Sequence, residues 1–164
     1  ETVLQDSNCH GVELPVRRIA RVLDGGTPDL LLADLERQWH LQLQSLLASG
    51  ATPVLFSSRG ELRFGSATEG RRFSRELAQL MGRLAANLAA DLGYLISKGG
   101  ITTQTLLADG LGLESVQLEG QLLPGLSLVR PSEGSHAGLP ILTFPGNLGD
   151  ATTLREAWQR MQAG

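Results

Sequence analysis

Two glycine-rich segments lie where predicted strands run into predicted helices, and such turns are suited to binding phosphate. In the first, an apolar stretch ends at Ser97 and is followed by a lysine, two glycines, an isoleucine and two threonines. Paired glycines allow a sharp turn and let a ligand approach with no Cβ in the way. The first turn of the following helix leaves amides unpaired at the positive end of the helix dipole. The segment therefore predicts a phosphate-binding turn, formed by Lys98, Gly99, Gly100, Ile101, Thr102 and Thr103.

A purely structural interpretation of this segment explains the pattern equally well. The two glycines would then make only a tight strand-to-helix connection, with Thr102 as the helix cap. Two common nucleotide motifs do not fit the segment. No Gly-Lys-Ser/Thr sequence closes it as in a Walker A loop, and the dinucleotide fingerprint requires three spaced glycines.

The second segment, 144–150, also follows a predicted strand and precedes a predicted helix. It therefore lies at the carboxyl edge of the sheet, where ligands bind in open α/β folds. Gly146 permits close approach, and the side chain of Asn147 both donates and accepts hydrogen bonds. The alternative, which the local pattern favours slightly, is a Pro-Gly-Asn turn with Asp150 as a helix cap. A third segment, 120–125, has the pattern of a loop between two strands.

The elements that must position these segments alternate between strand and helix in the earlier part of the chain. Strands are expected near 12–14, 52–57, 94–97, 115–118, 126–129 and 139–144, and helices near 15–23, 27–47, 71–91, 101–111 and 151–161. Thr27 is the expected cap of the second helix, and the stretch 58–70 is expected to be a loop. Strands that alternate with helices and then cluster predict an α/β fold, a three-layer α/β/α domain with a mixed, largely parallel sheet.

The bulk composition excludes several classes of protein. The length of 164 residues fits a single domain, and the net charge of −3 argues against binding to nucleic acid or to anionic membranes. No run approaches the roughly 18 apolar residues of a membrane span, and the spacing of cysteine and histidine predicts no metal site. The single cysteine, Cys9, fits a reducing cytoplasm. Because the chain starts at Glu1 rather than at methionine, we interpret it as a fragment of a longer protein.

Taken in order, the three segments resemble the C-terminal nucleotide-binding domain of the four-carbon acid sugar kinase family. Members typically read Lys-Gly-Gly-Ile-Thr-Ser, then Gly-Gln-x-x-Pro-Gly, then Phe-Pro-Gly-Asn-Val-Gly. The corresponding stretches here are 98–103, 120–125 and 144–149, and Thr103 replaces the usual serine. A Ser-Ser-Arg stretch at 57–59 is similar to another family segment.

The resemblance implies an ATP-dependent kinase that uses Mg²⁺ and phosphorylates a four-carbon sugar acid such as a 3-oxo-tetronate, erythronate or threonate. It implies two domains, of which the N-terminal one binds the sugar acid and supplies acidic catalytic residues. The catalytic residues within this chain are therefore unknown. By motif match, the nucleotide contacts are Gly99, Gly100, Ile101 and Thr102, with Gly146 and Asn147 on the facing loop.

The family's Gly-Ser-x-Ser segment, a further nucleotide contact, and the whole sugar-acid domain are not in this sequence. A domain that holds one substrate cannot supply the proximity of two reactants, a contribution of up to about 7–11 kcal/mol. We therefore expect the fragment alone to be inactive as a kinase. We also expect a cytoplasmic bacterial protein. Its oligomeric state is left open by the sequence, and a homodimer is one of the options.

Two other classes of function stay open at this point. One is a non-catalytic module that binds a nucleotide or another anion. The other is a protein-interaction module without a ligand, which an older label of some family members as type III secretion effectors would suggest. Stabilisation by ATP against thermal unfolding is expected for a kinase domain and for a nucleotide-binding module, but not for a protein-interaction module without a ligand.

Overall fold

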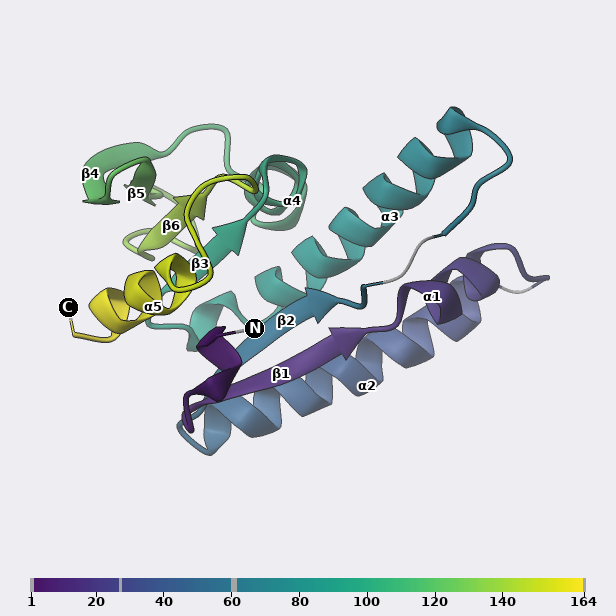
Figure 1. Ribbon diagram of the computed structural model, residues 1–164, viewed down its shortest axis with the longest axis horizontal. Helices are drawn as coiled ribbons and strands as arrows, with labels where there is room; N and C mark the ends of the chain where they lie inside the picture. Colours follow the sequence, from purple (N-terminus) through teal and green to yellow (C-terminus); the bar gives the residue numbers. More distant parts are fainter. Residues whose placement is uncertain (1, 27, 60–61, 164) are drawn as a thin grey trace.

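A computed structural model describes residues 2–26, 28–59 and 62–163 and shows helices packed around a set of strands (Figure 1). The strands are β1 (Cys9–Leu14), β2 (Thr52–Ser57), β3 (Leu95–Lys98), β4 (Gln117–Leu123), β5 (Leu126–Arg130) and β6 (Ile141–Phe144). The helices are α1 (Val16–Leu23), α2 (Pro28–Ala48), α3 (Ala67–Ala86), α4 (Gly100–Thr105) and α5 (Thr153–Ala163). Three short helical turns are η1 (Thr2–Gln5), η2 (Ala89–Asp91) and η3 (Leu106–Gly110), the last a π turn that continues α4.

The described strands form two sheets. β1 and β2 pair in parallel, and the second sheet has the order β3-β6-β5-β4. Within it, β3 and β6 are parallel, whereas β5 pairs antiparallel with both β6 and β4. The predicted α/β class with mixed pairing is confirmed, but parallel and antiparallel pairs are equal in number and the sheet is divided in two. The antiparallel share rises because a two-residue turn joins β4 to β5, and so short a connection permits only a hairpin.

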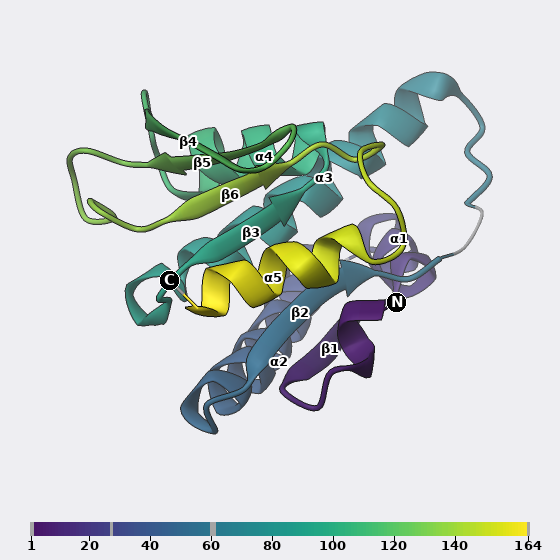
Figure 2. The same cartoon turned by 60° about the vertical axis from the view of Figure 1, so that its left-hand side comes forward.

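Helices cover both faces of the strands and form the outer layers (Figure 2). On one face, α1, α2 and α3 pack on β1 around the fully buried Leu14 and Leu84. On the other face, α5 packs on Phe144 of β6, and its Trp158 packs with Cys9 of β1. The helix α5 therefore touches both sheets, and the predicted three-layer α/β/α arrangement is confirmed. None of the described helices combines the length and the apolar character that a membrane span requires.

Most predicted elements are present, and the start of α3 lies earlier than predicted. The helix starts at Ala67, inside the stretch expected to be a loop. Its cap is Ser66, whose hydroxyl accepts a hydrogen bond from the Glu69 amide at 3.2 Å, while the Glu69 carboxylate accepts one from the Gly65 amide at 2.9 Å. This serine and glutamate, three residues apart, form a reciprocal cap that extends the helix beyond its apolar pattern. The proposed cap Thr27 lies outside the described residues.

The buried and exposed leucines of α2 provide a matched test of the core. Leu35 is 5% exposed and lies in the core between α2 and β1, whereas Leu31, one turn earlier, is 48% exposed. We expect Leu35→Ala to lower the free energy of unfolding by about 2–5 kcal/mol, because it leaves a cavity. Leu31→Ala should change it by no more than about 0.5 kcal/mol. Urea unfolding of both variants checks this, and equal costs would contradict the assigned orientation of α2.

Candidate functional site

The two glycine segments meet at the carboxyl ends of β3 and β6. Lys98 is paired with Phe144 in the parallel register, and the amide of Gly99 donates to the Phe144 carbonyl at 2.8 Å. A Cβ added to Gly146 would lie 3.5 Å from the Cα of Gly99. The two loops therefore approach each other as bare backbone, in the arrangement that the glycines of both segments predicted.

The first segment turns sharply into α4 at Gly99. Gly99 has a φ of +103° and is the residue before the helix, a conformation that residues with a Cβ rarely adopt. The first helical bond in this turn runs from the Thr103 amide to the Gly99 carbonyl at 2.9 Å. The amides of the three residues between them therefore have no partner within the helix. No side chain caps α4, so the interpretation of Thr102 as its cap is wrong.

The hydroxyl of Thr103 is already used inside the protein. It lies 2.8 Å from the hydroxyl of Ser97, which is 5% exposed, and it also donates to the Ser97 carbonyl at 3.2 Å. These bonds tie the start of α4 to the end of β3. Thr103 therefore positions the turn, whereas Thr102 keeps a hydroxyl that makes no such bond to the strand.

The side chain of Lys98 reaches across to the second segment. Its ammonium nitrogen, Nζ, donates to the carbonyls of Pro145 at 3.2 Å and Leu148 at 3.4 Å. The same nitrogen lies 3.7 Å from the centre of the Phe144 ring, a cation–π contact. Partial burial lowers the pKa of this ammonium from its ordinary value. Lys98 thus holds the second loop against β3.

A cavity of about 430 Å³ opens beside the two glycine turns. Its lining residues are Gly99, Gly100, Thr103, Gln104, Leu107, Thr143, Phe144 and Pro145. Ile101, at 65% exposure, and the exposed Asn147 lie at the surface of the same loops. None of the lining side chains is a carboxylate, so the wall carries no negative charge that would repel an anion from the start of α4.

Five of the lining residues were not named as site residues from the sequence, although Phe144 and Pro145 belong to the second segment. Gln104 lies about one helical turn beyond Gly100 and Leu107 about two, positions that could have suggested them. Thr143 reaches the cavity from β6, where it is paired with Ser97. Nothing in the sequence showed that pairing.

The third segment was predicted to be a loop, and this prediction is wrong. It supports the second segment instead. Its residues form the end of β4 and a two-residue turn into β5. Gly125 in that turn has a φ of +79°, and a Cβ there would lie 2.8 Å from the Cδ2 of Leu148. The Gln121 side chain closes the turn by accepting a hydrogen bond from the Gly125 amide at 3.2 Å. The hairpin tip therefore packs directly on the loop that carries Gly146.

Asp150 caps α5, as the structural interpretation of its segment predicted. One carboxylate oxygen accepts hydrogen bonds from the amides and the hydroxyls of Thr152 and Thr153, at 2.8–2.9 Å. These bonds lower the pKa of Asp150 to about 2, those from Thr152 contributing most. The cap fixes the far end of the glycine loop. The close approach of Gly146 to Gly99 and the cap at Asp150 therefore occur together.

The Ser-Ser-Arg stretch lies at the carboxyl end of β2. The hydroxyl of Ser58 accepts a hydrogen bond from the Val16 amide at 3.0 Å and so holds the start of α1. Ser57 lines a different cavity, between the two sheets, and Arg59 is exposed. This stretch therefore does not join the cavity at the two glycine turns.

The chain matches the model of a family described as the nucleotide-binding C-terminal domain, over residues 4–154. The chain belongs to this family. The resemblance drawn from the three segments is confirmed as far as the nucleotide-binding domain is concerned. No curated protein matches the chain.

Two solved structures share the fold of this nucleotide-binding C-terminal domain. Both are of a Bordetella bronchiseptica protein described as a domain of unknown function, DUF1537, crystallised with bound citrate as a domain-swapped dimer in two crystal forms. The TM-scores are 0.68 and 0.72, with 20% and 22% sequence identity over 98% of this chain. The chain covers only 35% and 37% of those chains, about a third of their length.

A substitution at the hairpin tip of this nucleotide-binding domain tests the support of its glycine loop. Gly125→Ala combines a positive φ with the clash against Leu148, whereas Gly134→Ala has a similar φ of +81° and open space around the new Cβ. We expect Gly125→Ala to cost about 0.5–1.5 kcal/mol more free energy of unfolding than Gly134→Ala, because the Leu148 side chain must leave its rotamer to make room. Chemical denaturation measures the difference. Equal costs would show that Leu148 moves away from the hairpin tip without penalty and that this contact does not hold the loop.

The cap at Asp150 predicts a pH dependence. Because the pKa of its carboxyl is lowered to about 2 in the folded protein from 3.8, the cap stabilises the fold fully above the unfolded value. That stability is lost as the pH falls through the folded value. Asp150→Asn, which still accepts hydrogen bonds but does not titrate, should therefore lose less stability than the wild type between about pH 5 and pH 2. Parallel pH profiles of thermal unfolding for the two proteins would refute this assignment.

Proposed function

We propose that this domain binds ATP with the triphosphate at the corner between the Gly99–Gly100 turn and the 145–147 loop. The observation that carries the proposal is the close approach of the two loops: a Cβ added to Gly146 would lie 3.5 Å from the Cα of Gly99. That approach brings two loops, which meet at glycines, to the carboxyl ends of two parallel strands, the edge at which α/β proteins bind ligands.

In this proposal the amides at the start of α4 donate hydrogen bonds to the phosphates. Those of Gly100, Ile101 and Thr102 precede the first helical bond, and the helix dipole adds positive potential there. The exposed Asn147 side chain adds a polar group from the second loop, whereas Thr102 lines the cavity between the two sheets. Lys98 acts mainly through position, because its nitrogen already binds two carbonyls of the second loop.

The described residues do not themselves present a site for Mg²⁺. No group of three acidic, histidine or cysteine side chains among them is arranged to hold a metal ion, and the Asp150 carboxylate is engaged in its cap. A magnesium ion that accompanies ATP is commonly held by the phosphates and only one or two carboxylates. In our proposal the ion comes with the nucleotide, and its carboxylate ligands lie outside the part of the chain described here.

We further propose that the domain is the C-terminal half of a two-domain cytoplasmic kinase for four-carbon sugar acids. The family to which the chain belongs and its coverage of about a third of the solved relatives support this. In this proposal the sugar acid and the catalytic acidic groups come from another domain, and the 164 residues alone form a single ATP-binding unit. The domain-swapped dimers of those relatives support a homodimer of the complete protein.

The proposal is tested by thermal unfolding with ATP, with and without Mg²⁺. At a concentration 100 times the dissociation constant, binding stabilises a protein by about 2.7 kcal/mol, which for this size raises Tm by about 5–10 °C. Gly100→Val should weaken binding at least about tenfold while preserving the fold, because nothing lies within 4 Å of the new Cβ. Gly26→Val, also in open space but far along the chain, is the matched control.

Unchanged ATP affinity of Gly100→Val would place the phosphates elsewhere, and no protection by ATP under any condition would favour a protein-interaction module. A kinase assay then separates the two ligand-binding functions. The complete protein should phosphorylate a four-carbon sugar acid, whereas the 164-residue chain should show no measurable activity. A complete protein that binds ATP but phosphorylates none of these acids would be a non-catalytic module.

A further inference from the structure

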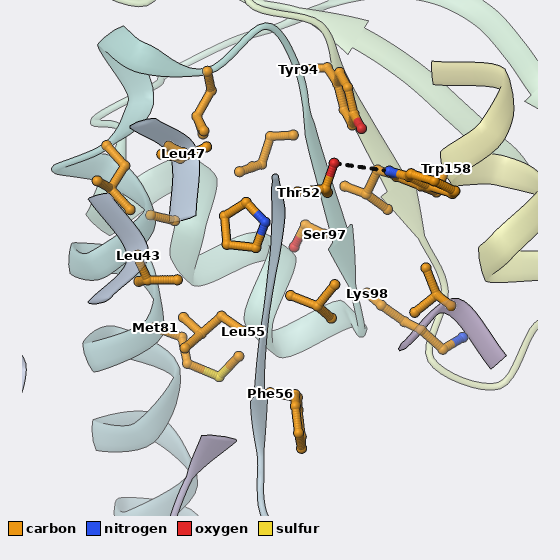
Figure 3. A pocket seen from close by; sticks show the side chains of 18 of the residues that line it. Leu43, Leu47, Thr52, Leu55, Phe56, Met81, Tyr94, Ser97, Lys98 and Trp158 are labelled. Atoms are coloured by element: carbon orange, nitrogen blue, oxygen red, sulfur yellow. Dashed lines mark hydrogen bonds between the residues drawn. The ribbon is translucent and has the colours of Figure 1, made fainter. Parts of the chain in front are cut away.

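A second cavity, of about 640 Å³, lies between the two sheets (Figure 3). Its lining includes every residue of β2 from Thr52 to Ser57 and every residue from Tyr94 to Lys98. Side chains alternate between the two faces of a strand, so a cavity against a sheet face would touch only every second residue. An unbroken run of lining residues shows that the cavity is bounded by strand edges. We call this cavity the slot.

The backbone groups on these two edges have no strand partner among the described residues. The amides at the ends of β2, those of Thr52 and Ser58, donate to carbonyls on the β1 side, at 2.8 and 2.9 Å. Because amides alternate between the edges of a strand, those of Leu55 and Ser57 point into the slot. Pro53, which has no amide hydrogen, is on the same edge and leaves the ladder open from Leu55 onward.

The same reasoning applies to β3. Its Leu95 amide donates to Pro140 at 2.9 Å, and the Gly99 amide donates to Phe144 at 2.8 Å, both on the β6 side. The amides of Ile96 and Lys98 therefore point toward the slot. The arrows of β2 and β3 run in the same direction in both ribbon views (Figure 1, Figure 2).

Helices close the slot from both faces. Leu43 of α2 and Met81 of α3 line it on one side, and Trp158 of α5 lines it on the other. At the start of the two strands, Trp158 donates to the Thr52 hydroxyl at 3.3 Å (Figure 3). The Gln162 amide nitrogen lies within hydrogen-bonding distance of the same hydroxyl, at 3.0 Å, and of the Tyr94 hydroxyl, at 2.9 Å. These contacts bridge the two sheets across the slot.

We propose that the slot receives one β-strand, parallel to β2 and β3, which joins the two sheets into one. The chemistry of its occupant follows from the walls. The occupant must present backbone donors and acceptors on both of its edges, because β2 and β3 each offer amides and carbonyls that have no strand partner among the described residues. It needs apolar side chains on both faces, as do strands buried between two layers of helices.

The strand is supplied by the same protein, from polypeptide outside these 164 residues. A slot that is covered on both faces by α2, α3 and α5 gives a preformed partner no open face to dock on, so the strand must be in place as the sheets assemble. The chain covers 35% and 37% of its solved relatives, which leaves ample polypeptide in a protein of that length to provide it. This inference does not rest on ATP binding and stands or fails separately.

Filling the slot with a side chain tests the proposal by the sign of its effect. Ala85 of α3 lines the slot, and Ala86, the next residue, does not. Ala85→Leu should raise the Tm of the 164-residue chain by about 2–4 °C, because it fills a void, and should lower that of the complete protein by a similar amount, because it collides with the strand. Ala86→Leu, the control, should shift both proteins in the same direction.

Shifts of the same sign for Ala85→Leu in both proteins, or no shift in either, would overturn the proposal. A second measurement does not require the shorter chain to fold. In the complete protein, the amides of Leu55, Ser57, Ile96 and Lys98 should exchange with solvent as slowly as that of Val54, which faces β1. Rapid exchange at these four amides would overturn the proposal.

The same exchange measurement identifies the source of the strand. Protection should persist at concentrations where light scattering shows a monomer, and after unfolding and refolding in ligand-free buffer. Loss of protection on dilution would assign the slot to a second copy of the chain, and loss after refolding would assign it to a small molecule. Either result would overturn the proposed source.

Discussion

The parallel pairing of β3 with β6 is the constraint on which the proposed phosphate site at the Gly99–Gly100 turn depends. The hydrogen bond from the Gly99 amide to the Phe144 carbonyl, at 2.8 Å, extends the ladder one residue beyond the end of β3. Both strands therefore end at the same level, and their following loops start side by side. A shift of one residue in this register would turn the strand side chains to opposite faces and separate the two glycine turns.

The loop that carries Gly146 is held from three directions, and this explains why a segment with so few side chains keeps its place. Lys98 binds two of its carbonyls from β3, the hairpin tip at Gly125 packs on its Leu148, and the Asp150 cap fixes its exit into α5. Each support comes from a different element. A loop restrained in this way loses little conformational entropy when a ligand binds, so the loop is preorganised for the phosphate binding proposed here.

Local patterns predicted the parts of this fold that are local in origin. The leucine period predicted the helix α2, the apolar run predicted the strand β2, and the paired glycines predicted the turn into α4. Of the two interpretations of 144–150, the helix cap at Asp150 is confirmed, and the ligand-binding role of Gly146 and Asn147 stays a prediction. The early start of α3 was missed although its signature, Ser66 followed by Glu69, is present in the sequence.

The missed features arise from contacts between segments far apart in the chain. The hairpin at 120–125 had the composition of a loop, and the packing of Gly125 on Leu148, together with the positive φ of Gly125, became apparent only in the structure. The same is true of Gly110, where a Cβ would lie 2.9 Å from the Gly82 carbonyl oxygen. The division of the strands into two sheets likewise depends on which edges find partners, and no single segment encodes that outcome.

The strand β3 lies between the slot and the cavity at the glycine turns. Ser97, Lys98 and Thr102 line the slot, while Gly99 and Thr103, their immediate neighbours, line the cavity at the glycine turns. In the described structure β3 is hydrogen-bonded along one edge only, and a strand in the slot would secure the other. Pairing on both edges restricts the motion of a strand more than pairing on one. Filling the slot would therefore also fix the end of β3, from which the Gly99 turn and the Lys98 side chain project toward the proposed phosphate site.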